Sequence, residues 1–284
     1  MKIIECPRDA MQGIDEFIPT EKKIQYINQL LRVGFDTIDF GSFVSPKAIP
    51  QMRDTAEVLD GLDMNIGRSK LLAIAANTRG AEDACKFGMI SYLGFPLSIS
   101  ETFQKRNTNK SIVEALNTVA EMQDLCVKHG KQLVTYISMG FGNPYGDPYD
   151  EGVVGKFVDI LQTLGVEIVS LADTIGVSKP DQISKLFKSM TSQFPSTEFG
   201  VHLHSNPATA TEKIEAAYKS GCSRFDGAIK GYGGCPMAED ELVGNLATET
   251  IVRYLVDQNV ELTLDMDEFG KSIMLADKVF PAGT

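Results

Sequence analysis

Two histidines two positions apart, His202 and His204, are the residues of this chain whose types and spacing most directly indicate chemistry. They lie in the run Phe199–His204, which is predicted to be a β-strand. Side chains at positions i and i+2 of a strand point to the same face, so both imidazoles should project to one side. Two imidazoles on one face make half of a divalent metal site, although a pair of hydrogen-bonded core histidines would show the same spacing. The place of the pair in the repeating pattern of the chain helps to distinguish these alternatives.

Eight strand-like runs alternate with helix-like segments. The strands are expected at Lys2–Cys6, Asp36–Phe40, Lys70–Ala76, Met89–Phe95, Gln132–Ser138, Glu167–Ala172, Glu198–His204 and Ser223–Ala228. The helices are expected at Thr20–Val33, Pro46–Leu59, Gly80–Phe87, Ser111–His129, Asp150–Leu164, Pro180–Ser192, Ala208–Ser220 and Glu241–Val256, with an extra C-terminal helical segment from Leu262 to Phe280. This alternation indicates parallel βαβ units, and the count of eight predicts a closed (β/α)8 TIM barrel. An open doubly wound sheet is the alternative, but no Gly-x-Gly-x-x-Gly follows the first strand. With no linker or low-complexity tract, a single domain over residues 1–284 is the simplest organisation.

Polar residues gather where the expected strands end, which is where active sites of such barrels form. They include Arg8, Asp9, Asp39, Ser42, Asn77, Arg79, Ser138, Asp173, Thr174 and the two histidines. Any one of them, Asp173 for example, could be a cap or turn residue, but the set favours an active site. One carboxylate from Asp9, two imidazoles and an amide or water suit an octahedral Mg²⁺ or Mn²⁺. Such an ion can polarise a carbonyl, and Arg8 beside it could stabilise an enolate.

Two residues late in the chain extend this set. Cys235 lies in a glycine-rich loop before Pro236. That loop could close over a substrate, and its thiol could serve as a nucleophile or an acid/base group, unless it is a buried small residue. Asn245 follows Gly244 and is either a helix cap or an oxygen ligand for the metal.

The composition narrows the function further. The net charge is −11, with 38 acidic against 27 basic residues, so a nucleic-acid partner is not expected. No apolar signal region and no stretch of about 18 apolar residues is present, which argues against a membrane. The 5 cysteines are scattered without disulfide or zinc-finger spacing. A reduced, cytoplasmic compartment is therefore expected.

The chain resembles the hydroxymethylglutaryl-CoA lyases, members of the metal-dependent lyases and Claisen-type synthases built on a TIM barrel. The similarity runs along nearly the whole chain. The matching segments are Pro7–Asp9 with Gln12, Ser42–Lys47, Pro50–Met52, Asp173–Val177, Val201–His204, Gly233–Pro236 and Gly244–Glu249. The Arg-Asp and His-x-His pieces belong to the wider superfamily, whereas Ser42–Lys47 and Gly233–Pro236 resemble the lyase branch in particular.

The resemblance implies roles for individual residues. The metal ligands would be Asp9, His202, His204 and Asn245, and the catalytic residues would be Arg8, Asp39, Asp173, His202 and Cys235. Arg8 would stabilise the enolate of the departing acetyl group, and Cys235 would act from a flexible loop. The reaction would be a retro-Claisen cleavage of hydroxymethylglutaryl-CoA to acetyl-CoA and acetoacetate, with Mg²⁺ or Mn²⁺ as cofactor. A homodimer is expected by analogy alone.

The sequence departs from the lyase pattern on the substrate side. Asp39 stands where the family has a glutamate, and Ser205 where an aspartate normally follows the second histidine. A lysine expected after Gln12 is absent, and Asp15 and Glu16 occupy that region. These changes leave open a related aldolase or a Claisen-type synthase acting on a 2-oxo or 3-hydroxy acid without CoA. A barrel that binds a metal or metabolite without catalysis is the remaining alternative.

Overall fold

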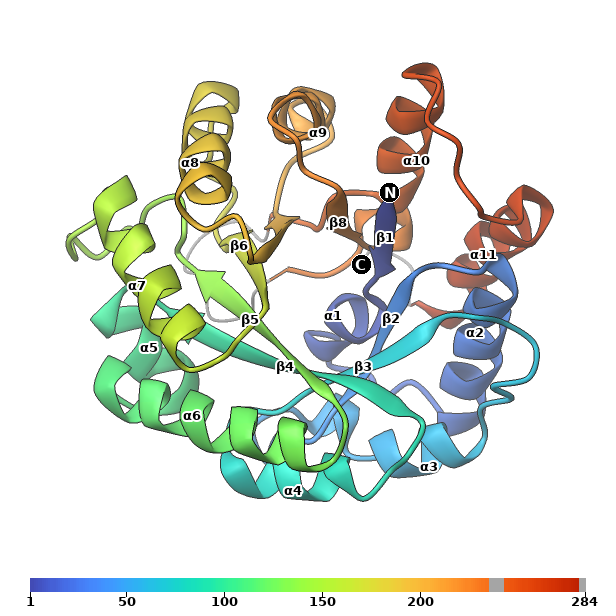
Figure 1. The fold of residues 1–284 in the computed structure, drawn as a ribbon. Coiled ribbons are helices and arrows are strands. Elements are labelled where there is room, and N and C mark those ends of the chain that lie inside the picture. Colours follow the sequence, from blue (N-terminus) through green and yellow to red (C-terminus); the bar gives the residue numbers. More distant parts are fainter. Residues whose placement is uncertain (235–242, 281–284) are drawn as a thin grey trace.

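Eight parallel strands form a closed barrel in the computed structural model, which describes residues 1–234 and 243–280 (Figure 1). The strands follow sequence order: β1 Lys2–Glu5, β2 Thr37–Ser42, β3 Lys70–Ile74, β4 Ile90–Ser98, β5 Gln132–Ser138, β6 Ile168–Asp173, β7 Glu198–Leu203 and β8 Arg224–Gly227. Strand β8 pairs with β1 from Lys2 opposite Arg224 to Glu5 opposite Gly227, and this pairing closes the barrel. The predicted (β/α)8 TIM barrel is thus confirmed.

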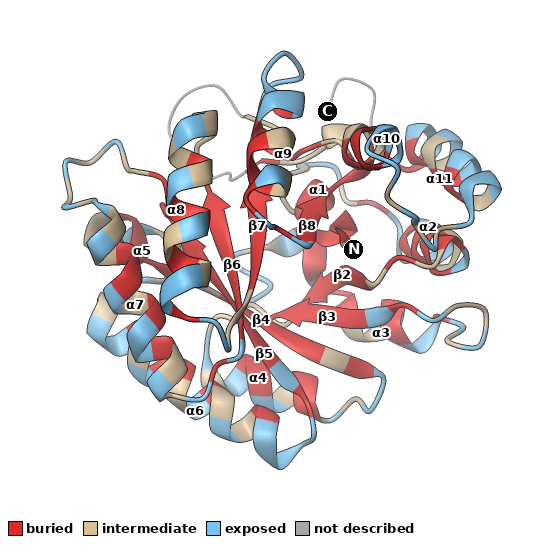
Figure 2. Cartoon of the chain, turned by 45° about the horizontal axis from the view of Figure 1, so that its top comes forward, coloured by how far each residue is buried: buried red, intermediate tan, exposed pale blue. Residues whose placement is uncertain are grey.

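Helices surround the barrel and cover its outer face (Figure 2). They are α1 Pro7–Gln12, α2 Thr20–Val33, α3 Thr55–Asp60, α4 Thr78–Cys85, α5 Glu101–Thr108, α6 Ile112–Lys128, α7 Glu151–Thr163, α8 Pro180–Gln193, α9 Ala210–Lys219, α10 Thr248–Asp257 and α11 Met266–Val279, with short 3₁₀ turns η1 Pro50–Met52 and η2 Ile229–Gly231. Buried residues line the strands and the inner helix faces, whereas exposed residues face outward. No helix of the described residues is long and apolar enough to cross a membrane.

The extra C-terminal helix packs on the outside, as expected. Helix α11 contacts α2, and Phe269 on α11 meets Phe35 edge-on with ring centroids 6.0 Å apart. Phe280, just after α11, meets Tyr26 of α2 in the same way at 5.5 Å. These aromatic contacts hold α11 against the first βα unit.

Three expectations for the helices need correction. The helix expected over Pro46–Leu59 is split into η1 and α3, because the residue before a proline avoids the helical region; Ile49, before Pro50, has φ −131° and ψ 82°. Helices α1 and α5 were not anticipated, since each is too short to show a clear apolar period. The last expected helix, Glu241–Val256, begins only at Thr248, and its residues 241 and 242 lie outside the described part.

Candidate functional site

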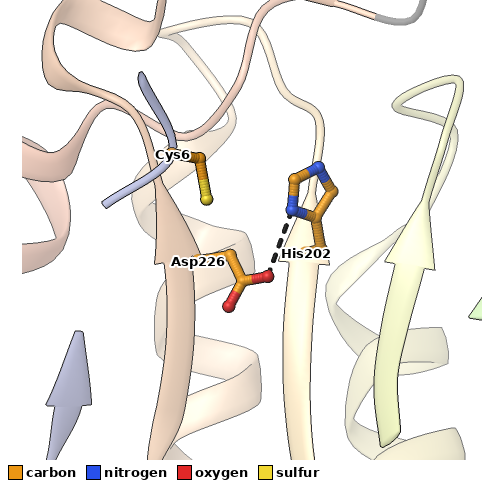
Figure 3. A group of neighbouring side chains, drawn as sticks. All are labelled: Cys6, His202 and Asp226. Atoms are coloured by element: carbon orange, nitrogen blue, oxygen red, sulfur yellow. Dashed lines mark hydrogen bonds and ion pairs between the residues drawn. The ribbon is translucent and has the colours of Figure 1, made fainter. Parts of the chain in front are cut away.

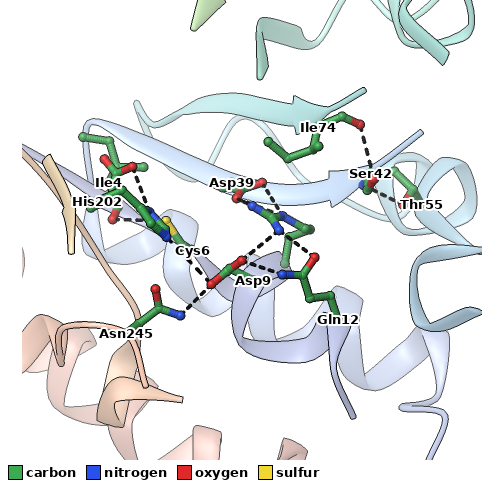
Figure 4. A network of polar contacts seen from close by, with 12 residues as sticks. Ile4, Cys6, Asp9, Gln12, Asp39, Ser42, Thr55, Ile74, His202 and Asn245 are labelled. Carbon is green, nitrogen blue, oxygen red and sulfur yellow. Dashed lines mark hydrogen bonds and ion pairs between the residues drawn. The ribbon is translucent and has the colours of Figure 1, made fainter. Parts of the chain in front are cut away.

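A carboxylate and two imidazoles meet at the carboxyl end of the barrel. Asp9 lies on α1 directly after β1, and His202 and His204 lie at the end of β7. One ligand atom from each of the three residues falls within 4.8 Å of the other two, and all three residues are buried. Nε2 of His202 is 4.0 Å from Oδ2 of Asp9 (Figure 4). The residues that the sequence singled out as metal ligands are therefore gathered in one place.

Both imidazoles use Nδ1 for contacts within the protein. Nδ1 of His202 lies 3.2 Å from Oδ2 of Asp226 (Figure 3). Nδ1 of His204 lies 2.9 Å from the carbonyl oxygen of Val243. A neutral ring that donates from Nδ1 carries its lone pair on Nε2. Each ring is thus oriented by its Nδ1 contact, and Nε2 is the nitrogen that it could offer to a cation.

Asn245 joins this cluster from the opposite end of the chain. Its backbone forms an antiparallel bridge with His204, and its Nδ2 donates to Oδ2 of Asp9 at 2.7 Å and to the Tyr232 carbonyl at 2.9 Å. A side-chain amide can bind a cation only through its oxygen, so Oδ1 is the atom that Asn245 could offer. The amide also holds the carboxylate of Asp9 in place.

Arg8 is clamped between two carboxylates. Its Nε and Nη2 donate to Oδ2 of Asp39 at 3.0 and 2.5 Å, and its Nη1 donates to Oδ1 of Asp9 at 2.9 Å and to Gln12 at 2.9 Å. The pairing of β2 with β3 shifts register between Asp39 and Gly41, directly after this carboxylate. These contacts with described residues use four of the five N–H groups of a guanidinium, so one Nη2 hydrogen is left for a substrate.

Burial and neighbouring charges shift the pKa values of these groups in different directions. Burial raises the pKa of Asp39 more than Arg8 lowers it, which leaves the pKa at about 6. Burial also raises the pKa of Asp9, but Arg8 and the imidazoles outweigh it and the pKa lies below its usual value. Burial lowers the pKa of both histidines. Asp226 and Asp9 overcome this effect at His202, whose pKa is raised, whereas the pKa of His204 stays lowered.

Asp173 ends β6 but directs its carboxylate into the following loop. Its Oδ1 accepts from the Val177 N–H at 2.9 Å. Its Oδ2 accepts from the Ser178 N–H and hydroxyl and from Nζ of Lys213, at 3.0, 2.5 and 2.9 Å. The backbone carbonyl of Asp173 accepts from the His204 N–H at 3.3 Å. In this structure Asp173 therefore supports the loop and the strand that carries His204.

The other polar residues of the rim divide into two groups. Ser138 and Thr174 line the same cavity as Arg8, Asp9 and the histidines. Asn77 instead caps α4, because its Oδ1 accepts from the Gly80 N–H at 2.8 Å. Arg79 lines a separate hollow. Cys235 lies outside the described residues.

The cavity at this rim has a volume of about 430 Å³. Arg8, Asp9, His202 and His204 are among the residues that line it. Apolar side chains such as Ile74, Pro96 and Phe103 form much of the wall. Its size and its few convergent polar groups are typical of a site for a small organic substrate.

Two buried charged residues near the site were not singled out from the sequence. Lys213 on α9 reaches Asp173 and the carbonyl of His204. Asp226 on β8 contacts His202. A sequence signal for Asp226 did exist, because Arg224 and Asp226 alternate in a strand that a parallel barrel should bury, and such strands are normally apolar.

The fold and the cluster together define the class, a TIM-barrel enzyme whose site suits a divalent cation. The model of the HMGL-like family matches residues 2–274. Hydroxymethylglutaryl-CoA lyase YngG of Bacillus subtilis is 34% identical over 262 residues, which are 92% of this chain and 87% of the relative. The 3-hydroxy-3-isohexenylglutaryl-CoA/hydroxy-methylglutaryl-CoA lyase of Pseudomonas aeruginosa is 34% identical over 267 residues, 94% of this chain and 88% of the relative. The chain belongs to the HMGL-like family.

Solved structures agree with this assignment. The HMG-CoA lyase of Bacillus subtilis superposes with a TM-score of 0.90 at 33% identity, covering 98% of this chain and 93% of that one. An HMG-CoA lyase from Acinetobacter baumannii, in complex with coenzyme A and 3-methylmalate, gives 0.89 at 30% identity, covering 98% and 90%. With these relatives the protein is a carbon–carbon lyase, and the alternative of a non-catalytic barrel is set aside.

Proposed function

We propose that this lyase cleaves hydroxymethylglutaryl-CoA to acetyl-CoA and acetoacetate with Mg²⁺ or Mn²⁺ as its cation. One observation carries the proposal. The Arg8 guanidinium and the cluster of Asp9, His202 and His204 line one cavity. An anion-stabilising group thus adjoins a set of cation ligands, which is what the cleavage of a β-hydroxy thioester requires.

The donor set fits a divalent cation. Asp9, His202, His204 and the Oδ1 of Asn245 would hold it, and the lowered pKa of Asp9 keeps this carboxylate charged. One carboxylate, two imidazoles and an amide oxygen, with no thiolate among them, suit Mg²⁺ or Mn²⁺. When bound, the ion supplies Lewis acidity toward the carbonyl and hydroxyl oxygens of the substrate.

Arg8 is our candidate for stabilising the enolate of the departing acetyl-CoA. In the cleavage, the bond between C2 and C3 breaks, the tertiary alcohol becomes the ketone of acetoacetate, and negative charge develops on the thioester oxygen. A preorganised N–H group that points at that oxygen lowers the activation barrier to enolate formation, because the group needs no rearrangement during the reaction. The contacts to Asp39, Asp9 and Gln12 fix Arg8 in advance.

The reaction also moves two protons. The hydroxyl of C3 must lose its proton, and the carboxylate of Asp9, which lines the cavity, is our candidate acceptor. His202 acts in this step as a ligand, because its Nδ1 proton faces Asp226 and its Nε2 lone pair would be on the cation. The enolate carbon must then gain a proton. Cys235 remains our candidate for that donor. Asp39 and Asp173 act, in our proposal, by holding Arg8 and the strand end of His204, respectively.

A second substrate class is favoured by one observation. Asp15 lines the cavity where the lyase pattern would have a lysine nearby. A carboxylate there repels an anionic thioester, so a 2-oxo or 3-hydroxy acid without CoA is the alternative substrate of the same lyase chemistry.

The experiment is to incubate purified protein with hydroxymethylglutaryl-CoA and Mg²⁺ or Mn²⁺, with and without EDTA, and to quantify acetoacetate. EDTA-sensitive product that is lost in His202→Ala supports the proposal. The matched control is His129→Ala, because His129 is an exposed histidine at the end of α6. Protein that binds metal but forms no acetoacetate contradicts the named substrate. Cleavage of CoA-free hydroxymethylglutarate in a parallel incubation would then favour the second class.

We also propose a cytoplasmic location, a homodimer and one domain over residues 1–284. Four described cysteines, Cys6, Cys85, Cys126 and Cys222, are free thiols, in keeping with a reducing compartment. Light scattering of the purified protein tests the dimer, and limited proteolysis tests the single domain.

A further inference from the structure

Two charged residues lie inside the barrel directly below the cation-binding cluster. Arg224 and Asp226 sit two positions apart on β8, so both point to the same face of the strand. The register places His202 opposite Asp226. Arg224 is 0% exposed and Asp226 is 2% exposed. Such charges are rare in a barrel interior unless they have a function.

The contact between Asp226 and His202 fixes the orientation of the ring. Nδ1 of His202 lies 3.2 Å from Oδ2 of Asp226. The ring also packs edge-on against Tyr136, with centroids 5.7 Å apart and an interplanar angle of 85°. A carboxylate acceptor at Nδ1 holds the proton on that nitrogen, which leaves the lone pair on Nε2.

Arg224 is fitted into the barrel beside this pair. A Cβ on Gly200 would lie 2.8 Å from Cδ of Arg224, so the glycine makes room for the arginine stem. Among the described residues no hydrogen-bond acceptor reaches the guanidinium nitrogens, and Oε1 of Glu198 is 3.7 Å from Nη1. Asp226 is the residue whose charge most favours the cationic form of Arg224, although burial opposes that form.

We propose that Asp226 is the positioning residue of His202 and that Arg224 supplies the counter-charge this buried carboxylate needs. The inference rests on the proposed cation site and adds two residues that act through His202. Oδ1 of Asp226, the hydroxyls of Tyr136 and Ser170 and the arginine nitrogens share this interior as buried polar atoms without protein partners in the described part of the chain. Ordered water is what normally satisfies such groups, and it would connect Arg224 to Asp226.

A competing arrangement uses the same atoms. One ligand atom each from Cys6, His202 and Asp226 falls within 4.8 Å of the others. Figure 3 shows the three side chains as neighbours. These three could hold a thiophilic cation. The observed contacts favour the positioning of His202 by Asp226 instead. The thiol of Cys6 lies 3.8 Å from the Ile4 carbonyl oxygen, and Asp226 contacts Nδ1 of His202.

The first test is made on the wild-type protein, and variants serve only to assign its signals. The chain has 3 histidines, so the ¹⁵N spectrum of metal-free protein labelled at histidine contains few signals, and His129→Gln and His204→Gln assign them. At a pH where the rings are neutral, we expect His202 to carry its proton on Nδ1. A signal for the Nε2-protonated form would overturn the proposal.

The second test measures Mn²⁺ affinity by electron paramagnetic resonance. Replacing a carboxylate that orients a metal-binding histidine typically lowers the affinity for the metal by about 10- to 100-fold. We expect that loss in Asp226→Asn and a smaller loss in the same direction in Arg224→Met. The matched control is Glu5→Gln, in which another buried carboxyl of the barrel is replaced. Wild-type affinity in Asp226→Asn would overturn the inference.

Two further outcomes distinguish the proposed cation site, the positioning role of Asp226 and a metal site at Cys6. If the wild-type protein itself fails to bind Mn²⁺, the proposed cation site fails, while the tautomer of His202 still tests the role of Asp226. If Cys6→Ser weakens the binding of metal as strongly as Asp226→Asn, the ion sits on the inner cluster and the positioning proposal is overturned. We expect Cys6→Ser to bind Mn²⁺ as the wild type does.

Discussion

At the scale of single residues, the hydrogen bonds between Arg8 and Asp39 determine the orientation of the arginine side chain. Two nitrogens of Arg8 share one oxygen of Asp39, at 3.0 and 2.5 Å. The carboxylate is shorter by one methylene than the glutamate of the resembling lyases. The shorter arm still reaches Arg8, with both nitrogens within hydrogen-bond distance.

Replacing this carboxylate should damage catalysis more than metal binding. In Asp39→Asn the charge that holds Nε and Nη2 is lost, and we expect kcat/KM to fall by roughly 100-fold, the usual cost of misplacing a reacting group by about 1 Å. Asp39→Glu, which keeps the charge, should retain most of the activity. Steady-state kinetics together with Mn²⁺ affinity check this. Unchanged kcat/KM in Asp39→Asn would show that the orientation of Arg8 does not depend on its hydrogen bonds with the Asp39 carboxylate.

The candidate site could be predicted from the sequence only in part. Asp9, His202, His204 and Asn245 were found because strand ends of a barrel converge, so a polar residue at each end is a candidate. Asp226 was missed because its alternation with Arg224 in a buried strand indicates a buried charge but not the neighbour that it faces. Lys213 was missed because a lysine on a helix is normally exposed, and nothing in a single sequence marks this one as buried. The geometry of Asp173 could not be foreseen either, since a polar residue after a strand can turn toward the cavity or toward its own loop.

At the scale of secondary-structure elements, a buried lysine links β6, β7 and α9. Nζ of Lys213 donates at 2.9 Å to Asp173, to the Gly176 carbonyl and to the His204 carbonyl. A buried charge pair that loses one partner leaves the other charge uncompensated. The lysine therefore ties the support of His204 to the position of α9.

Removing that lysine should destabilise the fold. We expect Lys213→Met to lower the free energy of unfolding by about 3 kcal/mol, the lower end for a broken buried pair. Lys219→Met on the same helix is the matched control, since Lys219 forms an exposed pair with Glu215 and should change stability little. Urea unfolding measures both. Equal stability of the two variants would contradict the role assigned to Lys213.

A second buried carboxyl joins β1 to the elements after β8. Oε1 of Glu5 accepts from the Ile229 N–H at 2.9 Å and Oε2 from the Thr248 hydroxyl at 2.6 Å. Burial raises the pKa of Glu5 from 4.5 to about 8 despite these bonds. The folded protein therefore keeps this carboxyl protonated at a pH where the unfolded chain has released the proton.

This shift has a definite sign for stability. Because the folded state binds the extra proton between the unfolded and the folded pKa, stability should fall as the pH rises from about 4.5 to about 8 and then level off. Glu5→Gln lacks the ionising group and should lose less stability over the same range. Thermal unfolding of both proteins across that range decides the matter. Parallel curves would exclude a raised pKa at Glu5.

At the scale of the whole molecule, the barrel was predictable because strands and helices alternate eight times. The boundaries of long amphipathic helices such as α2, expected and found at Thr20–Val33, followed from their period and from Gly34 at the end. The expected helices were wrong around Pro50, where the residue before the proline leaves the helical region, and in residues 243–247, which form tertiary contacts. One such contact is the bridge between Asn245 and His204.

Cation binding should stabilise the whole barrel. A ligand that binds only the folded state at about 100 times its dissociation constant adds about 2.7 kcal/mol. We therefore expect the melting temperature to rise with Mn²⁺ in the wild type and in His129→Ala. His202→Ala should show no such rise. Calorimetry in the presence and absence of EDTA measures the difference, and a shift retained in His202→Ala would place the ion elsewhere.

The side chains of Asp9 and Asn245 meet although 236 positions separate them along the chain. During synthesis on the ribosome, the first of these residues emerges almost a full chain length before the last. A nascent chain therefore cannot assemble the complete ligand set until residue 245 has left the exit tunnel. Cation capture would then mark the end of folding and could not nucleate it, and metal uptake by stalled chains of increasing length would report when the barrel closes.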